Sequence, residues 1–473
     1  MSVPRIIPRS EHTISRSKIS PNALRVLYRL RDAGFQSFLV GGCVRDLLLG
    51  VEPKDFDVVT NALPEQIKRL FRNCRLVGRR FRLAHVFFGR EIVEVATFRA
   101  TTAPLQSEEP IPDAYPEDGE APEIDEPIEA ESGVGADVDQ ERMFDETGRI
   151  LWDNVYGTID EDVWRRDFTA NALYYNIADF SIWDYVGGVD DIASRTLRLI
   201  GDPETRYRED PVRMLRAARF EAKLGFSVDP ATAEPIGRLR GLLAGVPPAR
   251  LFDETLKLFL TGHGARSLEV LRRRGLLEVL LPTVEDYLSR HPGSVVEKLL
   301  IQGLTNTDRR VKEDKPVTPT FLFALLLYGP IAEAIESSPP EHWHELNTIM
   351  QACDKAIREA QVHVSIPKRF ALGVREMFAL QPRLEYPRGR RALRLLEHPR
   401  FRAAYDLLLL RAEHGLASEQ MAQWWTRVQE VSAEERAKMV DALAARSERP
   451  AGSRRGGRRR RRRRHQAQSS SSS

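Results

Sequence analysis

Apolar and polar positions divide the chain into an amino-terminal half with mixed periodicity and a carboxy-terminal half with helical periodicity. Up to about residue 200, stretches with apolar residues three and four apart alternate with short apolar runs that are typical of buried strands. The expected helices are Asn22–Ala33, Val44–Leu49 and Pro64–Phe71, and the expected strands are Ser37–Val40, Phe56–Thr60, His85–Phe88, Ile92–Phe98, Ala172–Ile177 and Ser181–Tyr185. This alternation predicts a small mixed α/β domain.

Beyond Asp210 the strand signals nearly vanish. Apolar residues recur at helical spacing in Val212–Lys223, Leu251–Leu260, Ala265–Leu281, Phe321–Leu327 and Ala403–Ala412. We therefore predict that the second half is all-helical and contains more than one unit. Residues 1–20, in contrast, are expected to form an extended arm.

The formal net charge of +3 conceals an acidic segment. Between Glu108 and Glu146 the chain has 16 acidic residues and one basic residue, so this segment carries −15 and the remainder of the chain carries +18. Its Pro, Gly, Ala and acidic residues show no periodicity, which predicts a disordered insertion over about 106–147. The basic remainder is typical of a nucleic-acid binder.

The carboxy-terminal segment is basic and of low complexity. Nine arginines lie between Arg454 and Arg464, and a serine run follows them. We expect a disordered tail that contacts RNA electrostatically, although such tails also bind acidic proteins.

Composition also bears on compartment. The chain has no apolar run of about 18 residues, so no membrane span is expected. Its amino-terminal residues lack the apolar core of a signal peptide, and Cys43, Cys74 and Cys353 have no ligand-like spacing. A cytoplasmic protein without a zinc or redox role is expected.

A glycine pair followed by two aspartates is the strongest chemical signal. Gly41 and Gly42 lie between the strand that ends at Val40 and a short helix, where backbone N–H groups and the helix N-terminus can hold a phosphate. Asp55 and Asp57 are two residues apart on an expected strand, so both carboxylates project from one face and can share two divalent cations. Each feature alone is compatible with a plain turn or a solvated loop, but together they predict a nucleotidyl-transfer site.

Two further segments supply candidate carboxylates and cations. Glu94, on an expected strand, is either a third metal-facing carboxylate or a solvent-facing residue. Arg165 or Arg166 could bind triphosphate oxygens in a bidentate way. Asp167 could hold the ribose, assist at the metal site or cap a helix.

Residues 209–220 open the helical half, with a proline at the first helical position. Asp210 and Arg213 are three residues apart and therefore lie on one helix face. A carboxylate acceptor beside a guanidinium donor complements the edge of adenine, whose N6 amine donates and whose N1 accepts. Capping also explains Asp210, and Arg213, Arg216 and Arg219 could instead line a phosphate groove.

A basic segment surrounds an aromatic residue ahead of the strand at His85–Phe88. Arg79, Arg80 and Arg82 flank Phe81, and this composition suits incoming RNA or phosphates, although an exposed turn would have the same composition. These three arginines are candidate RNA contacts.

These segments, in this order, resemble the class II nucleotidyltransferases, and within them the bacterial poly(A) polymerases. The resemblance runs from about residue 8 to residue 416, and its blocks are 41–46 (Gly-Gly-Cys-Val-Arg-Asp), 55–57 (Asp-Phe-Asp), 94–99, 165–173, 184–188 with Asp190 and Asp191, and 209–220. It implies an α+β protein with a polymerase β-like palm head of mixed sheet and helices, followed by an all-α neck, body and tail.

The resemblance also implies boundaries, ligands and roles. The implied parts are an arm at 1–20, a head at 21–200, a base-selecting neck at 201–265, an RNA-binding body and tail at 266–445 and a basic segment at 446–473. The implied ligands are two Mg²⁺ ions, ATP as substrate and RNA 3′ ends, with RNA-decay proteins as candidate partners. The implied site residues are Asp55 and Asp57 for the metals, Glu94 or Asp167 as the assisting carboxylate, and Gly41, Gly42, Arg45, Arg166, Asp210, Arg213 and Arg216 for the nucleotide.

The basic segment at 78–85 decides between two branches of this superfamily. It resembles the signature of bacterial poly(A) polymerases, as do residues 71–75 and 400–408, and the second half shows no phosphohydrolase-type metal motif. We expect template-independent addition of AMP to RNA 3′ ends, and the alternative is a tRNA CCA- or A-adding enzyme. A rival of a different class is a noncatalytic RNA-binding regulator that keeps the head as a scaffold. The acidic insertion is longer than the usual loop of the family.

Overall fold

A computed structural model describes residues 3–78, 82–100, 142–144, 150–153, 155–387 and 389–447. The chain divides into two compact units, Met1–Gly245 and Val246–Ser473. This division falls inside the neck predicted at 201–265. Most of the acidic insertion predicted at 106–147 and nearly all of the basic segment predicted at 446–473 lie outside the described residues.

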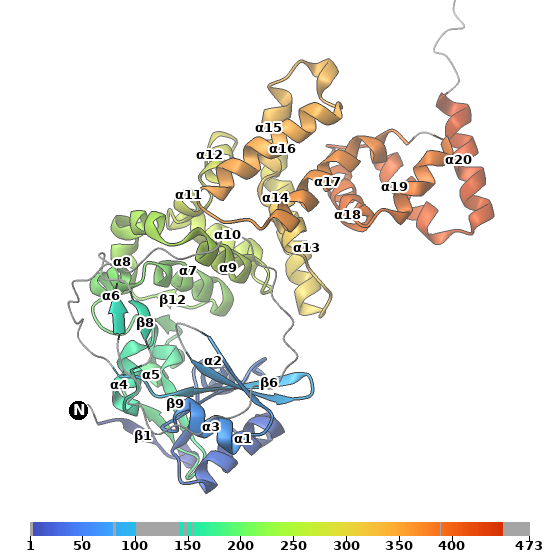
Figure 1. Ribbon diagram of the computed structural model, residues 1–473. Coiled ribbons are helices and arrows are strands. Elements are labelled where there is room, and N and C mark those ends of the chain that lie inside the picture. The colour runs from blue at the N-terminus through green and yellow to red at the C-terminus, as the bar shows by residue number, and fades with distance from the viewer. Residues whose placement is uncertain are drawn as a thin grey trace, which may run out of the picture. The chain divides into compact units, whose positions relative to one another are not determined.

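An eight-stranded mixed sheet forms the centre of the first unit (Figure 1). In spatial order its strands are β1 (Arg5–Ile7), β10 (Ile182–Asp184), β9 (Leu173–Asn176), β2 (Ser37–Val40), β3 (Asp57–Thr60), β6 (Glu91–Thr97), β5 (Leu83–Phe88) and β4 (Cys74–Val77). Within this sheet β3 and β6 are parallel, and the other neighbouring pairs are antiparallel. Two-stranded ladders are formed by β7 (Arg142–Phe144) with β8 (Ile150–Asp153) and by β11 (Thr196–Leu197) with β12 (Ser227–Val228).

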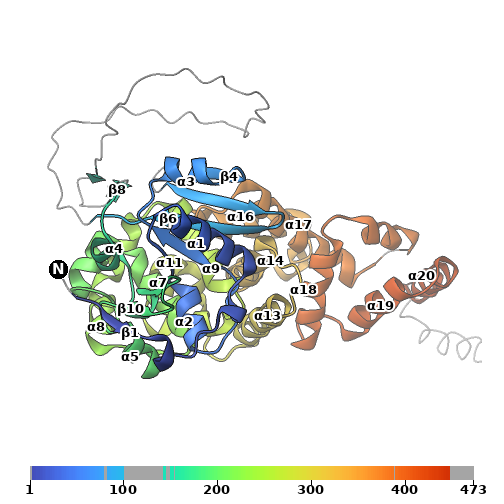
Figure 2. The same ribbon diagram turned by 90° about the horizontal axis from the view of Figure 1, so that it is seen from below.

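Helices cover both faces of the large sheet. The helices of the first unit are α1 (Pro21–Asp32), α2 (Gly42–Leu48), α3 (Pro64–Leu70), α4 (Ile159–Arg165), α5 (Gly188–Ala193), α6 (Pro203–Glu209), α7 (Val212–Leu224) and α8 (Pro230–Leu239). Helices α1 and α3 pack on one face (Figure 2). On the other face Ile159 and Val163 of α4 pack against Phe38, Val40 and Tyr174. The predicted α+β class is confirmed.

The prediction that Asp55 and Asp57 belong to one strand and project from the same face of it is wrong, because β3 begins at Asp57. Asp57 pairs with Val40, which is the last residue of β2. The next residue, Gly41, has a φ of 79° and turns the chain into α2. Strand β2 therefore ends before it could pair with residue 55.

Part of the predicted extended arm belongs to the sheet. Residues Arg5–Ile7 form β1, which pairs antiparallel with β10 at the edge of the sheet. Ile7 is buried there. Local sequence did not indicate this strand, because its partner lies more than 170 residues further along the chain.

The described part of the second unit is helical, as predicted. Its helices are α9 (Pro248–Phe259), α10 (Gly264–Arg273), α11 (Leu277–Leu280), α12 (Pro282–Arg290), α13 (Val295–Lys312), α14 (Pro319–Leu326), α15 (Tyr328–Glu336), α16 (Leu346–Gln361), α17 (Lys368–Glu385), α18 (Phe401–Glu413), α19 (Glu419–Glu430) and α20 (Ala433–Ser447). The stretch predicted as helical at Ala265–Leu281 forms two helices, because Gly275 interrupts it with a φ of 67°. No single helix in the described ranges has the length and apolar content to cross a membrane; α14 and α15, bent by 50° from each other, meet those criteria only as a pair.

Candidate active site

The turn between β2 and α2 brings together three candidate residues. Gly41 caps α2 with a left-handed φ of 79°, which favours glycine. A Cβ atom placed on Gly41 would lie 3.8 Å from Arg166 Nη1 and 3.9 Å from Asp57 Oδ2. Gly41 thus lies between a cation and a carboxylate. A glycine is expected at such a position when a ligand approaches the backbone closely.

Two of the predicted carboxylates lie side by side in the sheet. Asp57 of β3 and Glu94 of β6 are register partners, so both side chains project from the same face. Asp55 lies close enough to raise the pKa of Asp57. Although Asp57 reaches solvent, surrounding protein removes part of its hydration, and this effect together with Glu94 and Asp55 raises its pKa to about 6, against the opposing effect of Arg166.

Arg166 is held in place by two residues that the sequence did not single out. Its Nη2 and Nε donate to Asp162 Oδ2 at 2.9 and 3.2 Å, and its Nε also donates to the Tyr174 hydroxyl at 2.8 Å. The same hydroxyl donates to Asp162 Oδ2 at 2.8 Å. These contacts fix the guanidinium and leave Nη1 facing the Gly41 turn.

Asp167 is buried and turned toward the helical part of the unit. It accepts a hydrogen bond from Arg216 Nε of α7 at 2.7 Å, one from the Phe168 backbone at 2.8 Å and a longer one from Asn171 at 3.4 Å. Burial alone would raise the pKa of Asp167, but Arg216 and these hydrogen bonds lower it to about 2. Asp167 and Arg216 are therefore bonded to each other in this structure.

Arg45 is a buried arginine, with a side chain only 2% exposed. Its Nε and Nη2 donate to Asp46 Oδ1 at 2.9 and 2.6 Å, and its Nη1 donates to Asn171. Its guanidinium carbon lies 5.5 Å from the centre of the Phe220 ring of α7. Arg45 therefore joins α2, the Asp167 segment and α7, and lies beneath the glycine turn.

The prediction that Asp210 and Arg213 lie on one helix face is wrong, because Asp210 is extended, with a φ of −147°, and α7 begins only at Val212, after Pro211. Asp210 Oδ1 accepts from the Val212 N–H at 3.3 Å, as the capping alternative predicted.

Arg213 Nη1 donates to Glu209 Oε2 at 3.0 Å and to the Arg206 carbonyl at 2.7 Å. Arg206 donates to the same Glu209 oxygen at 2.7 Å and to the Arg166 carbonyl at 2.7 Å. This chain of contacts connects the Arg166 segment to the predicted base-reading pair, and neither Arg206 nor Glu209 was among the predicted site residues.

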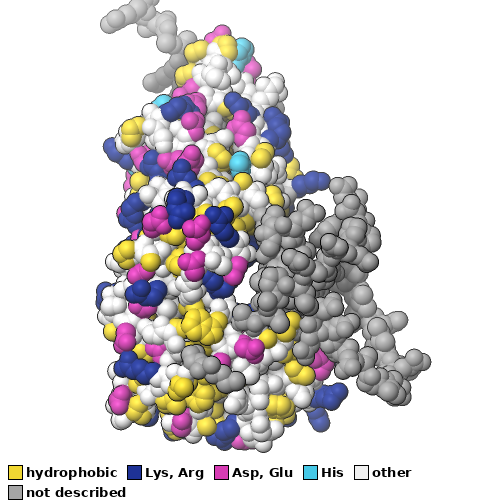
Figure 3. Space-filling model, turned by 90° about the vertical axis from the view of Figure 1, so that its left-hand side faces the viewer, with side chains coloured by type: hydrophobic (Ala, Val, Ile, Leu, Met, Phe, Trp, Pro, Cys, Tyr) yellow, Lys and Arg dark blue, Asp and Glu magenta, His cyan; other side chains and the backbone are white. Residues whose placement is uncertain are grey.

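Of the candidate RNA contacts, Arg79 and Arg80 lie outside the described residues. Arg82 forms an exposed ion pair with Glu65, with Nη1 and Oε1 2.8 Å apart. Figure 3 shows that Lys and Arg side chains are interspersed with Asp and Glu side chains over the face in view. Such exposed pairs contribute little to stability.

The block at 184–188 supports the site without facing it. The Asp184 carboxylate accepts four backbone N–H groups, those of Val186, Gly187, Gly188 and Val189, at 2.9 to 3.1 Å. A Cβ on Gly188 would lie 2.3 Å from the Thr169 carbonyl oxygen. The block therefore fixes the start of α5 close against the turn that follows Asp167.

Comparison with known proteins agrees with these observations. Family models match the chain at 37–198 (Poly A polymerase head domain), 225–288 (probable RNA and SrmB-binding site of polymerase A) and 341–466 (polymerase A arginine-rich C-terminus). The chain is 46% identical over 441 residues to poly(A) polymerase I of Salmonella typhi, which covers 93% of this chain and 88% of that protein. The chain belongs to the poly(A) polymerase I family. It is therefore a nucleotidyltransferase, as the motifs predicted.

Other relatives agree with this family placement. Poly(A) polymerase I of Haemophilus influenzae is 41% identical over 438 residues, which cover 92% of this chain and 90% of that protein. The CCA-adding enzyme of Bacillus subtilis is 32% identical over 263 residues, or 56% of each protein. Among solved structures, a CCA-adding enzyme in apo form II has a TM-score of 0.55 at 17% identity and covers 94% of this chain and 96% of that chain. At this identity the likeness shows the fold alone.

Proposed function

We propose that the first unit transfers AMP from ATP to the 3′ end of RNA without a template. The RNA 3′-oxygen attacks the α-phosphorus of ATP, the bond to the bridging oxygen breaks, and pyrophosphate leaves. Membership of the poly(A) polymerase I family supports this activity. The observation that carries the proposal is the pairing of Asp57 with Glu94 beside Gly41 and Arg166.

Asp55 and Asp57 fit a magnesium site. Carboxylate oxygens are the ligands that Mg²⁺ prefers, and a cation would offset the burial and the repulsion from Glu94 and Asp55 that raise the pKa of Asp57. Two such ions, held by Asp55 and Asp57, would supply stabilisation of the attacking and leaving oxygens. Among the described residues, no three His, Cys, Asp or Glu side chains form a cluster that could hold a metal ion.

Glu94 is better placed than Asp167 to be the third carboxylate. It lies beside Asp57 in the sheet and is half-exposed, with His85 Nε2 3.5 Å from its Oε1, whereas Asp167 is buried and bonded to Arg216. We propose that Glu94 assists Asp55 and Asp57 directly. Asp167 acts as a positioning residue that holds α7 against the site.

Arg166 and the glycine turn are proposed to bind the phosphates and ribose of ATP. The contacts with Asp162 and Tyr174 orient the guanidinium before the ligand arrives, which lowers the cost of binding. The backbone N–H groups near Gly41 and Gly42 receive phosphate oxygens. Arg45, which is buried under the turn, acts by positioning it.

Asp210 and Arg213 are proposed to read adenine, as a carboxylate acceptor and a guanidinium donor. Arg213 is already oriented by Glu209, and Glu209 is held by Arg206. Arg216 is proposed to contribute indirectly, by binding Asp167 and so holding α7 in place. Selection of ATP by protein side chains requires no template strand.

The remaining assignments follow the family. We propose residues 21–200 as head, 201–265 as neck and 266–445 as RNA-binding body and tail. Because the family model at 225–288 describes a probable RNA and SrmB-binding site, we propose RNA and a protein partner of that kind for this segment. The proposed compartment is the cytoplasm, where RNA 3′ ends and ATP occur together.

The direct test measures pyrophosphate release and primer extension with oligo(A), ATP and Mg²⁺. We expect wild type to release pyrophosphate in step with AMP added, and Asp57→Asn to lose both. Asp32→Asn is the matched control, since Asp32 is exposed in the same unit and pairs with its neighbour Arg31. RNA binding without pyrophosphate release would favour the noncatalytic regulator.

A second assay separates the two branches of the superfamily. The CCA-adding relatives are 32% identical to this chain and match 52% to 56% of it. A tRNA enzyme would add one to three nucleotides to tRNA and stop. We expect long adenylate tails on generic RNA, and addition confined to tRNA would overturn the assignment.

A further inference from the structure

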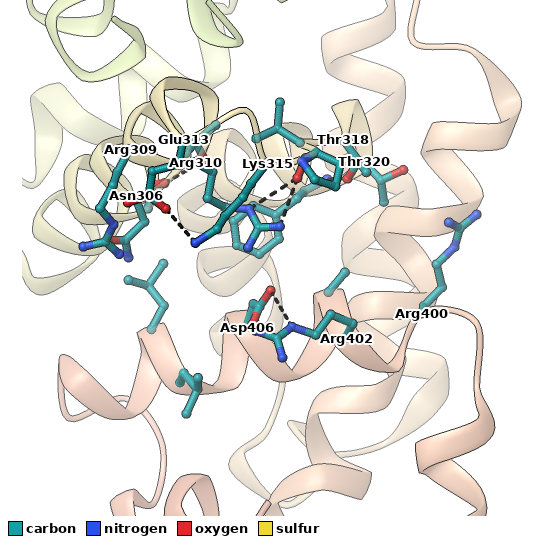
Figure 4. A pocket seen from close by; sticks show the side chains of 18 of the residues that line it. Asn306, Arg309, Arg310, Glu313, Lys315, Thr318, Thr320, Arg400, Arg402 and Asp406 are labelled. Atoms are coloured by element: carbon teal, nitrogen blue, oxygen red, sulfur yellow. Dashed lines mark hydrogen bonds and ion pairs between the residues drawn. The ribbon is translucent and has the colours of Figure 1, made fainter. Parts of the chain in front are cut away.

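The second unit contains a pocket that none of the proposed catalytic residues reaches. It has a volume of about 550 Å³ and lies between α13, the start of α14 and α18 (Figure 4). This volume suits a ligand of nucleotide size. The residues that line the pocket fall between Gly303 and Glu413, and thus outside the segment 225–288 that the family model describes as the probable RNA-binding site.

The lining is basic. Five lining side chains are cationic and three are acidic. Arg402 and Asp406 project from α18 on the opposite side of the pocket from Arg310 and Lys315, which belong to the end of α13 and the loop after it (Figure 4). An excess of cations from two separate elements around one hollow favours an anionic ligand.

Two of these cations pair with carboxylates, whereas Arg310 donates to the Pro316 carbonyl through Nε and Nη2 at 3.3 and 3.0 Å. Arg402 Nη2 lies 3.1 Å from Asp406 Oδ1, and the Arg402 side chain is 67% exposed. Lys315 pairs with Glu313 at 2.7 Å, also in an exposed position. Both side chains of the Lys315–Glu313 pair are exposed, and because exposed ion pairs contribute little to stability, exchanging the Glu313 carboxylate for a phosphate oxygen costs little.

The pocket also has an apolar wall. Phe321, in the first turn of α14, is partly exposed and lines it together with Pro316 and Pro399. An aromatic ring beside cations is the arrangement on which bases of single-stranded nucleic acid stack while their phosphates are held.

From this juxtaposition we propose that the α13–α14–α18 pocket binds one nucleotide of single-stranded RNA. The base stacks on Phe321, and the adjoining phosphate contacts Arg402 with Arg310 and Lys315. Adenine, with the larger stacking surface, is preferred over uracil. This inference rests on the proposed function only in taking RNA as the ligand, because the pocket performs no chemistry.

The test is binding of fluorescent oligo(A) and oligo(U), each about 15 nucleotides long, to the full chain without ATP, as a function of salt. Arg402→Gln should weaken oligo(A) binding several-fold and lower the salt slope by roughly 0.7, the value for one phosphate contact on a single strand. Phe321→Leu keeps an apolar side chain but removes the ring, and should weaken oligo(A) binding by about fivefold to a hundredfold, and oligo(U) binding less.

Arg290→Gln is the control, because Arg290 is an exposed arginine that pairs with Asp286 of its own helix and with Glu333 of α15, and it does not line the pocket. It should change neither affinity nor slope. Wild-type binding by both pocket variants, or an equal loss in Arg290→Gln, would overturn the proposal. Thermal unfolding checks that Phe321→Leu is folded, and Arg402→Gln decides alone if it is not.

The experiments distinguish an incorrect assignment of the pocket as an RNA site from an incorrect assignment of the catalytic function. If wild type extends neither a primer of about three nucleotides nor one of about 15, the catalytic proposal fails whatever the binding results. If the pocket is correct, both variants should keep the wild-type kcat at saturating primer of about 15 nucleotides and show a raised KM for that primer. A lowered kcat with an unchanged KM would overturn the pocket.

Discussion

Arg216 donates to Asp167 across 2.7 Å and so ties α7 to the segment that carries Arg166. The two residues are 49 positions apart in the chain, and the Asp167 carboxylate is buried. The pair therefore sets the position of the helix that carries Arg213 relative to the phosphate-binding side of the site.

This pair predicts a pH dependence of stability. The pKa of Asp167 is about 2 in the folded protein, against an ordinary value of 3.8. The contribution is therefore complete above about pH 4 and is lost as the pH falls toward about 2, and it amounts to roughly 2 to 3 kcal/mol. Urea unfolding across this range should show a steeper loss of stability in wild type than in Arg216→Gln.

The control for that comparison is Arg208→Gln, which removes an exposed arginine paired with Glu204 on the neighbouring helix α6. Its pH profile should follow wild type. Parallel profiles for wild type and Arg216→Gln would mean that the pair does not stabilise the fold.

Asp55→Ala should abolish AMP incorporation and leave RNA binding largely intact. Loss of a metal carboxylate removes several kcal/mol of transition-state stabilisation, so we expect a fall in kcat on the order of a thousandfold or more. Single-turnover incorporation and RNA affinity are measured on the same preparation. Retained incorporation would remove Asp55 from the mechanism.

The roles of Glu94 and Asp167 can be distinguished by measuring kcat and the free energy of unfolding separately for a variant of each residue. Glu94 is half-exposed, so Glu94→Gln should lower kcat by about a hundredfold without changing the free energy of unfolding. Asp167→Asn should lower the free energy of unfolding by roughly 2 kcal/mol and have the smaller effect on kcat. The reverse ranking would make Asp167 the catalytic carboxylate.

Arg213→Gln should relax the preference for ATP. Loss of a charged hydrogen bond to the base costs about 1.5 to 3 kcal/mol, so the ratio of kcat/KM for ATP to that for CTP should fall by about tenfold to a hundredfold. Arg208→Gln again serves as the control on the adjoining helix. Unchanged nucleotide selectivity would refute this assignment.

Truncation before Arg454 should lower both the affinity for RNA and the salt slope of binding. Each phosphate of single-stranded RNA that the arginines no longer neutralise lowers the slope by about 0.7. Removal of residues 469–473 alone, which deletes only serines, is the control. If the longer truncation changes neither quantity, the arginines serve another ligand.

Local patterns predicted the parts of the site that depend on neighbouring residues. The turn at Gly41 and the strand that carries Glu94 are examples, since periodicity and a glycine pair are visible over short windows. The Asp162 and Tyr174 contacts of Arg166 were not visible, because charge alone does not specify a partner. Arg45 was expected at the ligand, and its burial depends on Asn171, which lies 126 residues away.

The edge strand β1 has a practical consequence for anyone preparing shortened versions of the protein. Residues Arg5–Ile7 cover β10, and Arg5 also bonds Asp190 of α5. Removing them would leave β10 with unpaired backbone groups, which readily recruit a strand from another molecule. Expression boundaries and affinity tags that preserve these three residues should therefore give the less aggregation-prone material.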